Sequence, residues 1–351
     1  MPKRVVSAGD RKLIMAMVGV LIAVFAVIFS YVGANHSPKP HHLPIGIVGP
    51  ASVAEASRAQ LDRVDPAGFN VRDYDSLAAA KTAILHRSVY GAYQPDPSPV
   101  LVTANAASPA VASLLQRVFG PLAHASGRPL VTEDVAPLPP SDSAGATISS
   151  ALLGLIIAAL AGSSIIYTFS RQRHEYVRIA ATAVIALVAG VITALVTTVI
   201  VGAFSGGHFF AVWGVASLFV LAMGLPIAAS QVLFGAAGLG IGYLLFLVIG
   251  NPASGGSTAP ELLPPFWRGL SQALPDGAAV TSMRDVVYFN GYGSTDALIV
   301  LSVYAVVGGA VAMVAASGRA RTRSQRQSVA TPGAAPDDAC LVTPAHATHT
   351  P

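Results

Sequence analysis

Long apolar stretches without charged residues alternate with polar segments along this chain of 351 residues. The uncharged stretches are residues 13–34, 147–169, 179–203, 209–250 and 297–317. Residues 13–34 would form a helix about 33 Å long, enough to cross a hydrocarbon core of about 30 Å. The stretch 209–250 is about twice as long and predicts a hairpin of two helices, with its turn at 226–231. The pattern therefore predicts an α-helical integral membrane protein with six transmembrane helices.

The first apolar stretch has two possible interpretations. Basic residues precede it, and Val32-Gly33-Ala34 resembles the small-residue site at which a signal peptide is cleaved. The apolar region of a signal peptide has about 7–15 residues, and this stretch is longer. We therefore expect an uncleaved membrane helix, with a signal peptide as the alternative.

Residues 35–146 predict a small α/β domain inserted between the first and second transmembrane helices. Strands are expected over 43–48, 69–74, 89–93 and 100–104, and helices over 52–64, over 75–87 and from 109 onward. Ser52 and Glu55 have the spacing of a capping box, and Asp75 is expected to cap the second helix. The proline-rich residues 137–140 would link the domain to the membrane helices.

Two further polar segments lie near the C-terminus. Residues 251–296 are rich in Pro and Gly and have a helical middle, one face of which is apolar and comprises Phe266, Trp267, Leu270, Ala273 and Leu274. Such a helix would lie at the membrane interface, with Trp267 at the depth of the lipid headgroups. Residues 318–351 are polar and are expected to form a disordered tail.

Composition and charge agree with this arrangement. Only 11% of the residues are charged, against about 25% in soluble domains, and 53% are hydrophobic. Eleven of the 21 basic residues lie in residues 1–12, the loop 170–178 and the tail. Because basic residues favour the cytoplasmic side, we expect both termini in the cytoplasm and residues 35–146 and 251–296 outside the plasma membrane. The net charge of +4 is not gathered on one segment, which argues against a nucleic-acid partner.

Several kinds of chemistry are missing from the sequence. None of the six predicted spans contains Asp, Glu, Lys or Arg, which argues against a proton-driven pump and an intramembrane protease. No Lys follows a Gly, so there is no phosphate-binding P-loop. His36, His41 and His42 lie in a proline-rich linker without carboxylates and are expected to be solvated. We therefore predict no catalytic, metal-binding or cofactor-binding residues, and a protein that is not an enzyme.

The segment before the last span carries the most specific motifs. These are Gly-Asn-Pro-Ala-Ser-Gly-Gly at 250–256, Glu-Leu-Leu-Pro at 261–264, Leu-Pro-Asp-Gly-Ala at 274–278 and Arg-Asp-Val-Val-Tyr-Phe at 284–289. With one span, an insertion and then five spans, the chain resembles permease subunits of type 2 ABC exporters. Within them it is most similar to the branch of the YhgE/phage-infection-protein (Pip) membrane proteins. The resemblance covers residues 10–318.

The resemblance implies a partner and a site of contact with it. In such exporters a separate cytoplasmic ABC ATPase docks on the loop between the second and third spans. Here that loop would contribute Arg171, Arg173, His174, Glu175 and Arg178, with Glu175 meeting a groove of the ATPase. A loop whose basic residues serve only to orient the chain is the alternative. The family also implies that residues 251–296 dip back toward the membrane and help to close the outer end of the pathway.

Two functions follow as hypotheses. The first is a permease subunit that pairs with a second copy or a second permease, is driven by the ATPase, and exports a lipid-like or amphipathic substrate. The second is a membrane scaffold or accessory protein of a secretion or cell-envelope system that does not transport.

Overall fold

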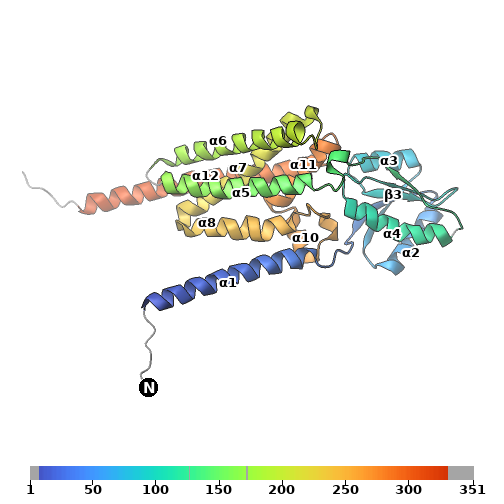
Figure 1. The fold of residues 1–351 in the computed structure, drawn as a ribbon, viewed down its shortest axis with the longest axis horizontal. Coiled ribbons are helices and arrows are strands. Elements are labelled where there is room, and N and C mark those ends of the chain that lie inside the picture. Colours follow the sequence, from blue (N-terminus) through green and yellow to red (C-terminus); the bar gives the residue numbers. More distant parts are fainter. Residues whose placement is uncertain (1–7, 126, 171–172, 331–351) are drawn as a thin grey trace, which may run out of the picture.

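The computed structural model describes residues 8–125, 127–170 and 173–330. It consists of a bundle of long helices and a mixed α/β domain packed at one end of that bundle (Figure 1). We call this the domain end of the bundle. The opposite end, beyond which the last helix extends, is called the tail end.

Five helices are long and apolar enough to cross a membrane, which confirms a membrane-embedded helical protein. They are α1 (Ala8–Asn35), α5 (Thr147–Phe169), α6 (Glu175–Leu195, continued by the π-helical η2 at Val196–Ile200), α7 (Phe209–Phe234) and α12 (Ser294–Ala330). The sixth expected span is a shorter apolar helix, Ala237–Ala253. It comprises α8 (Ala237–Gly242), the π-helical η4 (Tyr243–Gly250) and α9 (Asn251–Ala253).

The turn between α7 and this shorter helix lies at Gly235, so the expected turn at 226–231 is wrong. Helix α7 continues through Pro226 for two more turns and ends only where Gly235 adopts a φ of +65°. A proline inside a membrane helix is tolerated when neighbouring helices cover the backbone groups that it leaves unpaired. Here α12 packs closely on Pro226 through Gly308, and Ser230 donates a hydrogen bond to the Pro226 carbonyl at 2.8 Å.

Helix α7 is the centre of the bundle. In its most apolar window 61% of the residues are buried, against 39% or less in the other four spans. It packs against α5, α6, α11 and α12. Helix α12 approaches α7 closely at Gly308, because a Cβ at this position would lie 2.5 Å from the Pro226 nitrogen. Small residues that allow such close contact are what hold helices together in lipid.

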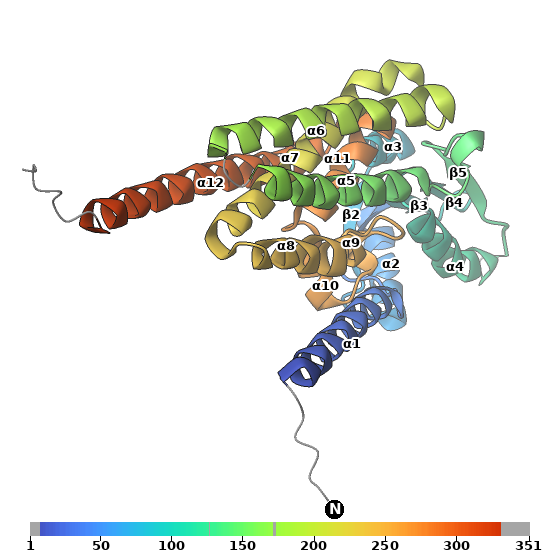
Figure 2. The same cartoon turned by 60° about the vertical axis from the view of Figure 1, so that its left-hand side comes forward.

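Helix α1 stands apart from the other spans (Figures 1 and 2), and only 6% of its apolar window is buried. Its contacts with the bundle lie near its C-terminal end. Ser30 donates to the Val248 carbonyl, and Asn251 donates to the Tyr31 hydroxyl at 2.7 Å. The rest of its apolar surface is therefore available to lipid or to another protein.

The α/β domain has a five-stranded sheet in the order β2-β1-β3-β4-β5, in which only the β3–β4 pair is antiparallel. Its strands are β1 (Leu43–Val48), β2 (Phe69–Tyr74), β3 (Gly91–Gln94), β4 (Val100–Thr103) and β5 (Val131–Asp134), and its helices are α2 (Ala51–Val64), α3 (Leu77–Leu85) and α4 (Pro109–Ala125). The expected α/β domain is thus present. Strand β5 was not predicted, because its sequence Val-Thr-Glu-Asp is short and mostly exposed.

Two predicted helix caps are wrong, one by two residues and the other by one. Helix α2 begins at Ala51, so Ser52 lies inside its first turn and Pro50 occupies the cap position without a side-chain bond. Helix α3 is capped by Ser76, which accepts a hydrogen bond from the Ala79 backbone, and not by Asp75.

Residues 251–296 are not an exposed loop. They form η5 (Pro260–Leu262), α10 (Pro265–Ser271) and α11 (Pro275–Tyr288), and several of their apolar side chains are buried. Ala259, Leu262 and Phe289 belong to the apolar core of the α/β domain. The domain and this segment therefore share one core. Helix α12 also extends beyond the expected end at residue 317, so residues 318–330 are helical and only 331–351 of the expected tail lie outside the described chain.

Replacing Gly308 by Ala should destabilise the bundle. The added Cβ meets the Pro226 backbone, which cannot move aside, and overpacking of this kind costs about 1–3 kcal/mol. The neighbouring Gly309→Ala is the matched control, because its Cβ would lie 3.6 Å from a Leu225 methyl group, an ordinary contact. Thermal unfolding of the full chain in mild detergent measures both. Equal melting temperatures for the two variants would contradict the close α7–α12 crossing.

Candidate functional site

Helix α11 joins the α/β domain to the bundle. It has 14 residues, packs against α5, α7 and α12, and buries eleven of its residues. A helix that is buried on all sides belongs to a core, whereas a surface helix buries one stripe. The sequence suggested a polar segment here because Asp276, Arg284 and Asp285 interrupt the apolar residues. All three are buried.

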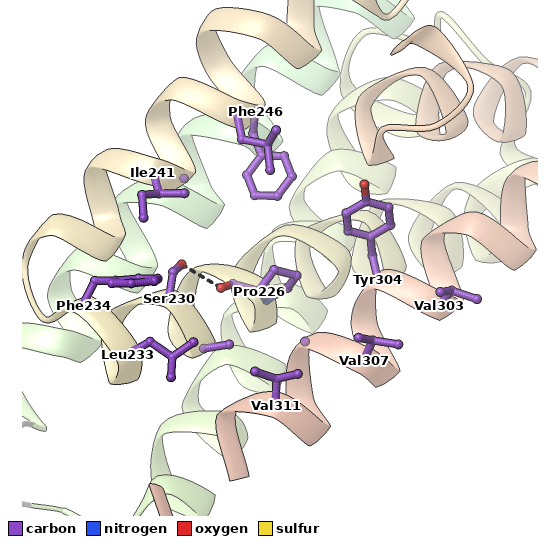
Figure 3. Close-up of a pocket in the computed structure, with 14 residues that line it drawn as sticks. Pro226, Ser230, Leu233, Phe234, Ile241, Phe246, Val303, Tyr304, Val307 and Val311 are labelled. Atoms are coloured by element: carbon purple, nitrogen blue, oxygen red, sulfur yellow. Dashed lines mark hydrogen bonds between the residues drawn. The ribbon is translucent and has the colours of Figure 1, made fainter. Parts of the chain in front are cut away.

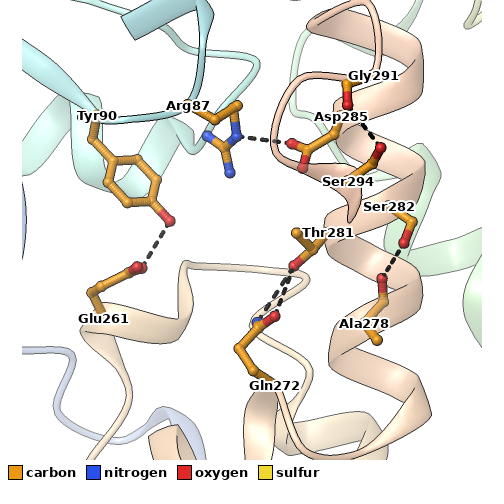
Figure 4. A network of polar contacts seen from close by, with 10 residues as sticks. All are labelled: Arg87, Tyr90, Glu261, Gln272, Ala278, Thr281, Ser282, Asp285, Gly291 and Ser294. Atoms are coloured by element: carbon orange, nitrogen blue, oxygen red, sulfur yellow. Dashed lines mark hydrogen bonds and ion pairs between the residues drawn. The ribbon is translucent and has the colours of Figure 1, made fainter. Parts of the chain in front are cut away.

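At the domain end, α11 is tied to the α/β domain by an ion pair (Figure 4). The Arg87 Nε atom donates to the Asp285 Oδ1 atom at 2.8 Å, and the two side chains are 12% and 1% exposed. The Arg87 guanidinium also lies 4.9 Å from the centre of the Phe289 ring. Nearby, the Tyr90 hydroxyl donates to the Glu261 carboxylate at 2.7 Å. Two side chains of the domain thus bind two acids of the segment 251–296.

Burial makes this junction sensitive to the loss of either partner. Desolvation raises the pKa of Asp285 to about 6, although the neighbouring Arg87 acts in the opposite direction. Arg87 itself has a φ of +61°, in the left-handed region that usually favours glycine after a helix. A strained backbone of this kind persists where the side chain has contacts that a glycine would lose. Here those contacts are with Asp285 and with the rings of Tyr90 and Phe289.

The opposite end of α11 carries an acid without a partner. Asp276 is fully buried, and neither of its carboxylate oxygens has a hydrogen-bond partner in another described residue. It faces the backbone of Gly250, where a Cβ would lie 2.3 Å from the Asp276 Oδ2 atom. Burying an ionised carboxylate without a partner costs several kcal/mol, far more than the about 0.3–1 kcal/mol that a helix N-terminus returns. The side chain is therefore favoured as a neutral acid here.

An apolar cavity of about 380 Å³ lies between helices α7, η4 and α12 (Figure 3). It opens at the surface of the bundle, where its lining residues Leu233 and Val307 are 47% and 54% exposed. Helices α7, η4 and α12 line it with residues that include Pro226, Leu233, Phe246, Tyr304 and Val307. Tyr304 lines the cavity and also lies within electrostatic range of Asp276. Sites for small molecules have about 300–1,000 Å³ and mostly apolar walls with a few polar groups. The cavity has this size and character.

The residues predicted to meet an ATPase divide into two groups. Arg173 and His174 are exposed at the tail end, whereas Arg171 lies outside the described residues. Glu175 and Arg178 pair with each other at 2.7 Å, and both side chains are less than a tenth exposed. Arg178 also donates to Gln231 of α7 at 3.3 Å. In this structure the Glu175 carboxylate is therefore directed at Arg178, and the pair joins α6 to α7 inside the bundle. Contact of this loop with an ATPase stays a prediction.

The predicted interfacial helix is shorter than expected and is largely packed inward. Helix α10 ends at Ser271, so Leu274 lies beyond it, and Leu274 is buried. Trp267 is buried against Gly33 and Ala34 of α1 and is not free to lie among lipid headgroups. Leu270 is half-buried beside it, and Phe266 alone of the four predicted residues is exposed.

The chain gives no significant match to any protein-family model, curated protein or solved structure. The functional argument therefore depends on the geometry. Its central polar residues are Arg87, Asp276 and Asp285, to which the sequence analysis assigned no role, although Asp276 and Asp285 lie in its motifs 274–278 and 284–289. The sequence contained one signal for Asp276. Pro275 followed by Asp276 is typical of a helix start, with proline in the first turn and an acid near the positive end of the helix dipole.

Replacing Arg87 by Met should weaken the attachment of the domain. Asp285 would be left buried without its counter-charge, which costs about 3–5 kcal/mol. Arg58→Met is the matched control, because its partner Asp73 is 45% exposed and such surface pairs contribute about 0–1 kcal/mol. Limited proteolysis of the full chain in detergent, together with thermal unfolding, compares the variants. If the Arg87→Met chain is as resistant to proteolysis and as thermally stable as the Arg58→Met chain, the Arg87–Asp285 pair does not hold the domain on the bundle.

Proposed function

We propose that this chain is the membrane-spanning permease subunit of an ABC exporter, powered by a separate cytoplasmic ATPase and moving a lipid-like or amphipathic substrate outward. The observation that carries the proposal is the apolar cavity that opens at the side of the bundle, between helices α7, η4 and α12. These three helices also pack against α11. A cavity with these walls suits an acyl chain or another apolar group, with the Tyr304 hydroxyl available to a polar atom.

The burial of residues 251–296 supports the same function. The resemblance to type 2 exporters implied a segment that dips back among the spans at the outer end of the pathway. Helix α11 packs among α5, α7 and α12, which is the position that such a segment requires. Its attachment to the α/β domain through Arg87 and Asp285 gives the domain a route by which it can influence the pathway.

The energy source is proposed to be a separate ATPase, because the sequence has no Lys preceded by Gly and hence no P-loop. With the basic tail end in the cytoplasm, the exposed Arg173 and His174 are available to that partner. The exposed apolar surface of α1 leaves room for a second permease copy. A non-transporting envelope scaffold is the alternative function, and it leaves the cavity without a role.

Arg173→Glu should reduce the amount of ATPase that co-purifies with the chain in gentle detergent by several-fold. The change reverses the charge of an exposed side chain at the tail end without disturbing the buried Glu175–Arg178 pair. Lys12→Glu is the control, since it reverses an exposed charge on α1. Wild-type chain that brings down no ATPase even after crosslinking would contradict the proposed partnership.

Val307→Trp should fill the cavity and reduce export of a fluorescent lipid from reconstituted vesicles, while leaving the fold intact. Val306→Trp is the matched control, because Val306 is 70% exposed on the same helix and does not line the cavity. The assay compares lipid export at equal protein levels. If both variants export at the wild-type rate, the cavity is not the substrate pathway.

A further inference from the structure

Asp276 has the properties of a proton-binding group, and nothing in the proposed ABC mechanism uses it. Its side chain is fully buried, its two oxygens have no hydrogen-bond partner in another described residue, and it is aimed at the backbone of Gly250. Gly250 is the last residue of the π-helical η4, and π-helical turns often mark functional positions in a helix. Any side chain at position 250 would collide with this carboxyl.

No cation compensates the acid. The other ionisable groups that the structure describes on α11 and on the helices packed against it are Tyr167, Tyr243, Arg268, Arg284, Asp285, Tyr288, Asp296 and Tyr304. Tyr304 is within electrostatic range of Asp276, whereas neither of the two described arginines acts on it. A tyrosine is neutral at physiological pH, so it offers no positive charge.

The surroundings favour a proton over a metal ion. Calcium and magnesium are bound by about six or more oxygen atoms, usually with several carboxylates. The described residues hold no group of three acids, histidines or cysteines that could share an ion with Asp276. A proton requires only one carboxyl group, and it removes the charge whose burial is unfavourable.

The position of Asp276 connects its protonation to movement. Helix α11 is fixed to the domain at Asp285, nine residues or about 14 Å further along the helix. Its first turn has no such ion pair and rests on close packing against Gly250 and Ser271. If this turn moves away from Gly250 and water enters, the acid becomes able to ionise. An ionised Asp276 then opposes the return of this first turn of α11 to its apolar site.

We propose that Asp276 is a proton-binding site that is protonated in this conformation and releases its proton to water when the first turn of α11 leaves Gly250. The O–H bond of the acid breaks, the proton passes to water, and the carboxylate becomes hydrated. The displacement of α11 would thus depend on pH. This inference requires neither the ATPase nor export, so it stands or fails independently of the proposed function.

Infrared spectroscopy of the full chain in vesicles of neutral lipid tests the protonation state directly. We expect the carbonyl band of a protonated, weakly hydrogen-bonded acid at neutral pH, and we expect Asp276→Asn to abolish it. Asp142→Asn is the matched control and should retain the band. Asp142 is also buried, but its carboxylate accepts hydrogen bonds from the Ala146 and Thr147 backbone, which Asp276 lacks. Wild-type chain without the band at neutral pH would overturn the proposal even if the variant fails to fold.

Thermal unfolding across pH tests the release. An acid that prefers its protonated form in the fold contributes stability that is lost as pH rises, so the melting temperature of the wild type should fall toward alkaline pH. The melting temperature of Asp276→Asn should therefore fall less with rising pH than that of the wild type. The melting temperature of Asp142→Asn should fall as it does in the wild type. An unchanged pH profile in Asp276→Asn would overturn the proposal. So would a stabilisation of the wild type by sodium at constant pH that the variant lacks, because it would indicate a cation site.

Discussion

The burial of α11, a helix with three charged residues, is the constraint on which the rest of the structure depends. A charge inside an apolar bundle must be paired, hydrogen-bonded or neutralised. The chain uses different solutions along this helix. Asp285 pairs with Arg87 of the α/β domain, Arg284 donates to the Gly256 carbonyl at 3.2 Å, and Asp276 has no hydrogen-bond partner in another described residue. The Arg87–Asp285 pair attaches the domain, and Asp276 places a titratable group within the bundle.

This arrangement explains why the domain and the bundle behave as one unit in the structure. Ala259, Leu262 and Phe289 complete the apolar core of the domain, while α11 packs against α5, α7 and α12. A change in the domain, such as the binding of a partner, would therefore reach the bundle through residues 251–296. The proposed exporter needs a connection of this kind between an external domain and a pathway in the membrane.

The membrane character, the α/β domain and most strand positions could be predicted from the sequence, because long uncharged stretches and short apolar runs are local patterns. The boundaries of 147–169 and of the strands 43–48 and 69–74 agree with the structure. The features that were predicted wrongly depend on contacts between helices that are distant in the sequence. Pro226 was expected at a turn, yet α12 packs Gly308 against it and the helix continues. Glu175 was expected at the surface, yet Arg178 holds it inside.

The main failure concerned residues 275–288, where polar residues suggested exposure and the structure shows burial. Labelling of single cysteines along this segment, in a chain whose Cys340 is replaced by Ser, tests the account most directly. Cysteines at Ala279, Ser282 and Val287, which are buried, should resist a water-soluble thiol reagent in membranes, whereas a cysteine at Tyr292, which is 49% exposed, should react. Rapid labelling at every position would show a solvated loop and would contradict the account.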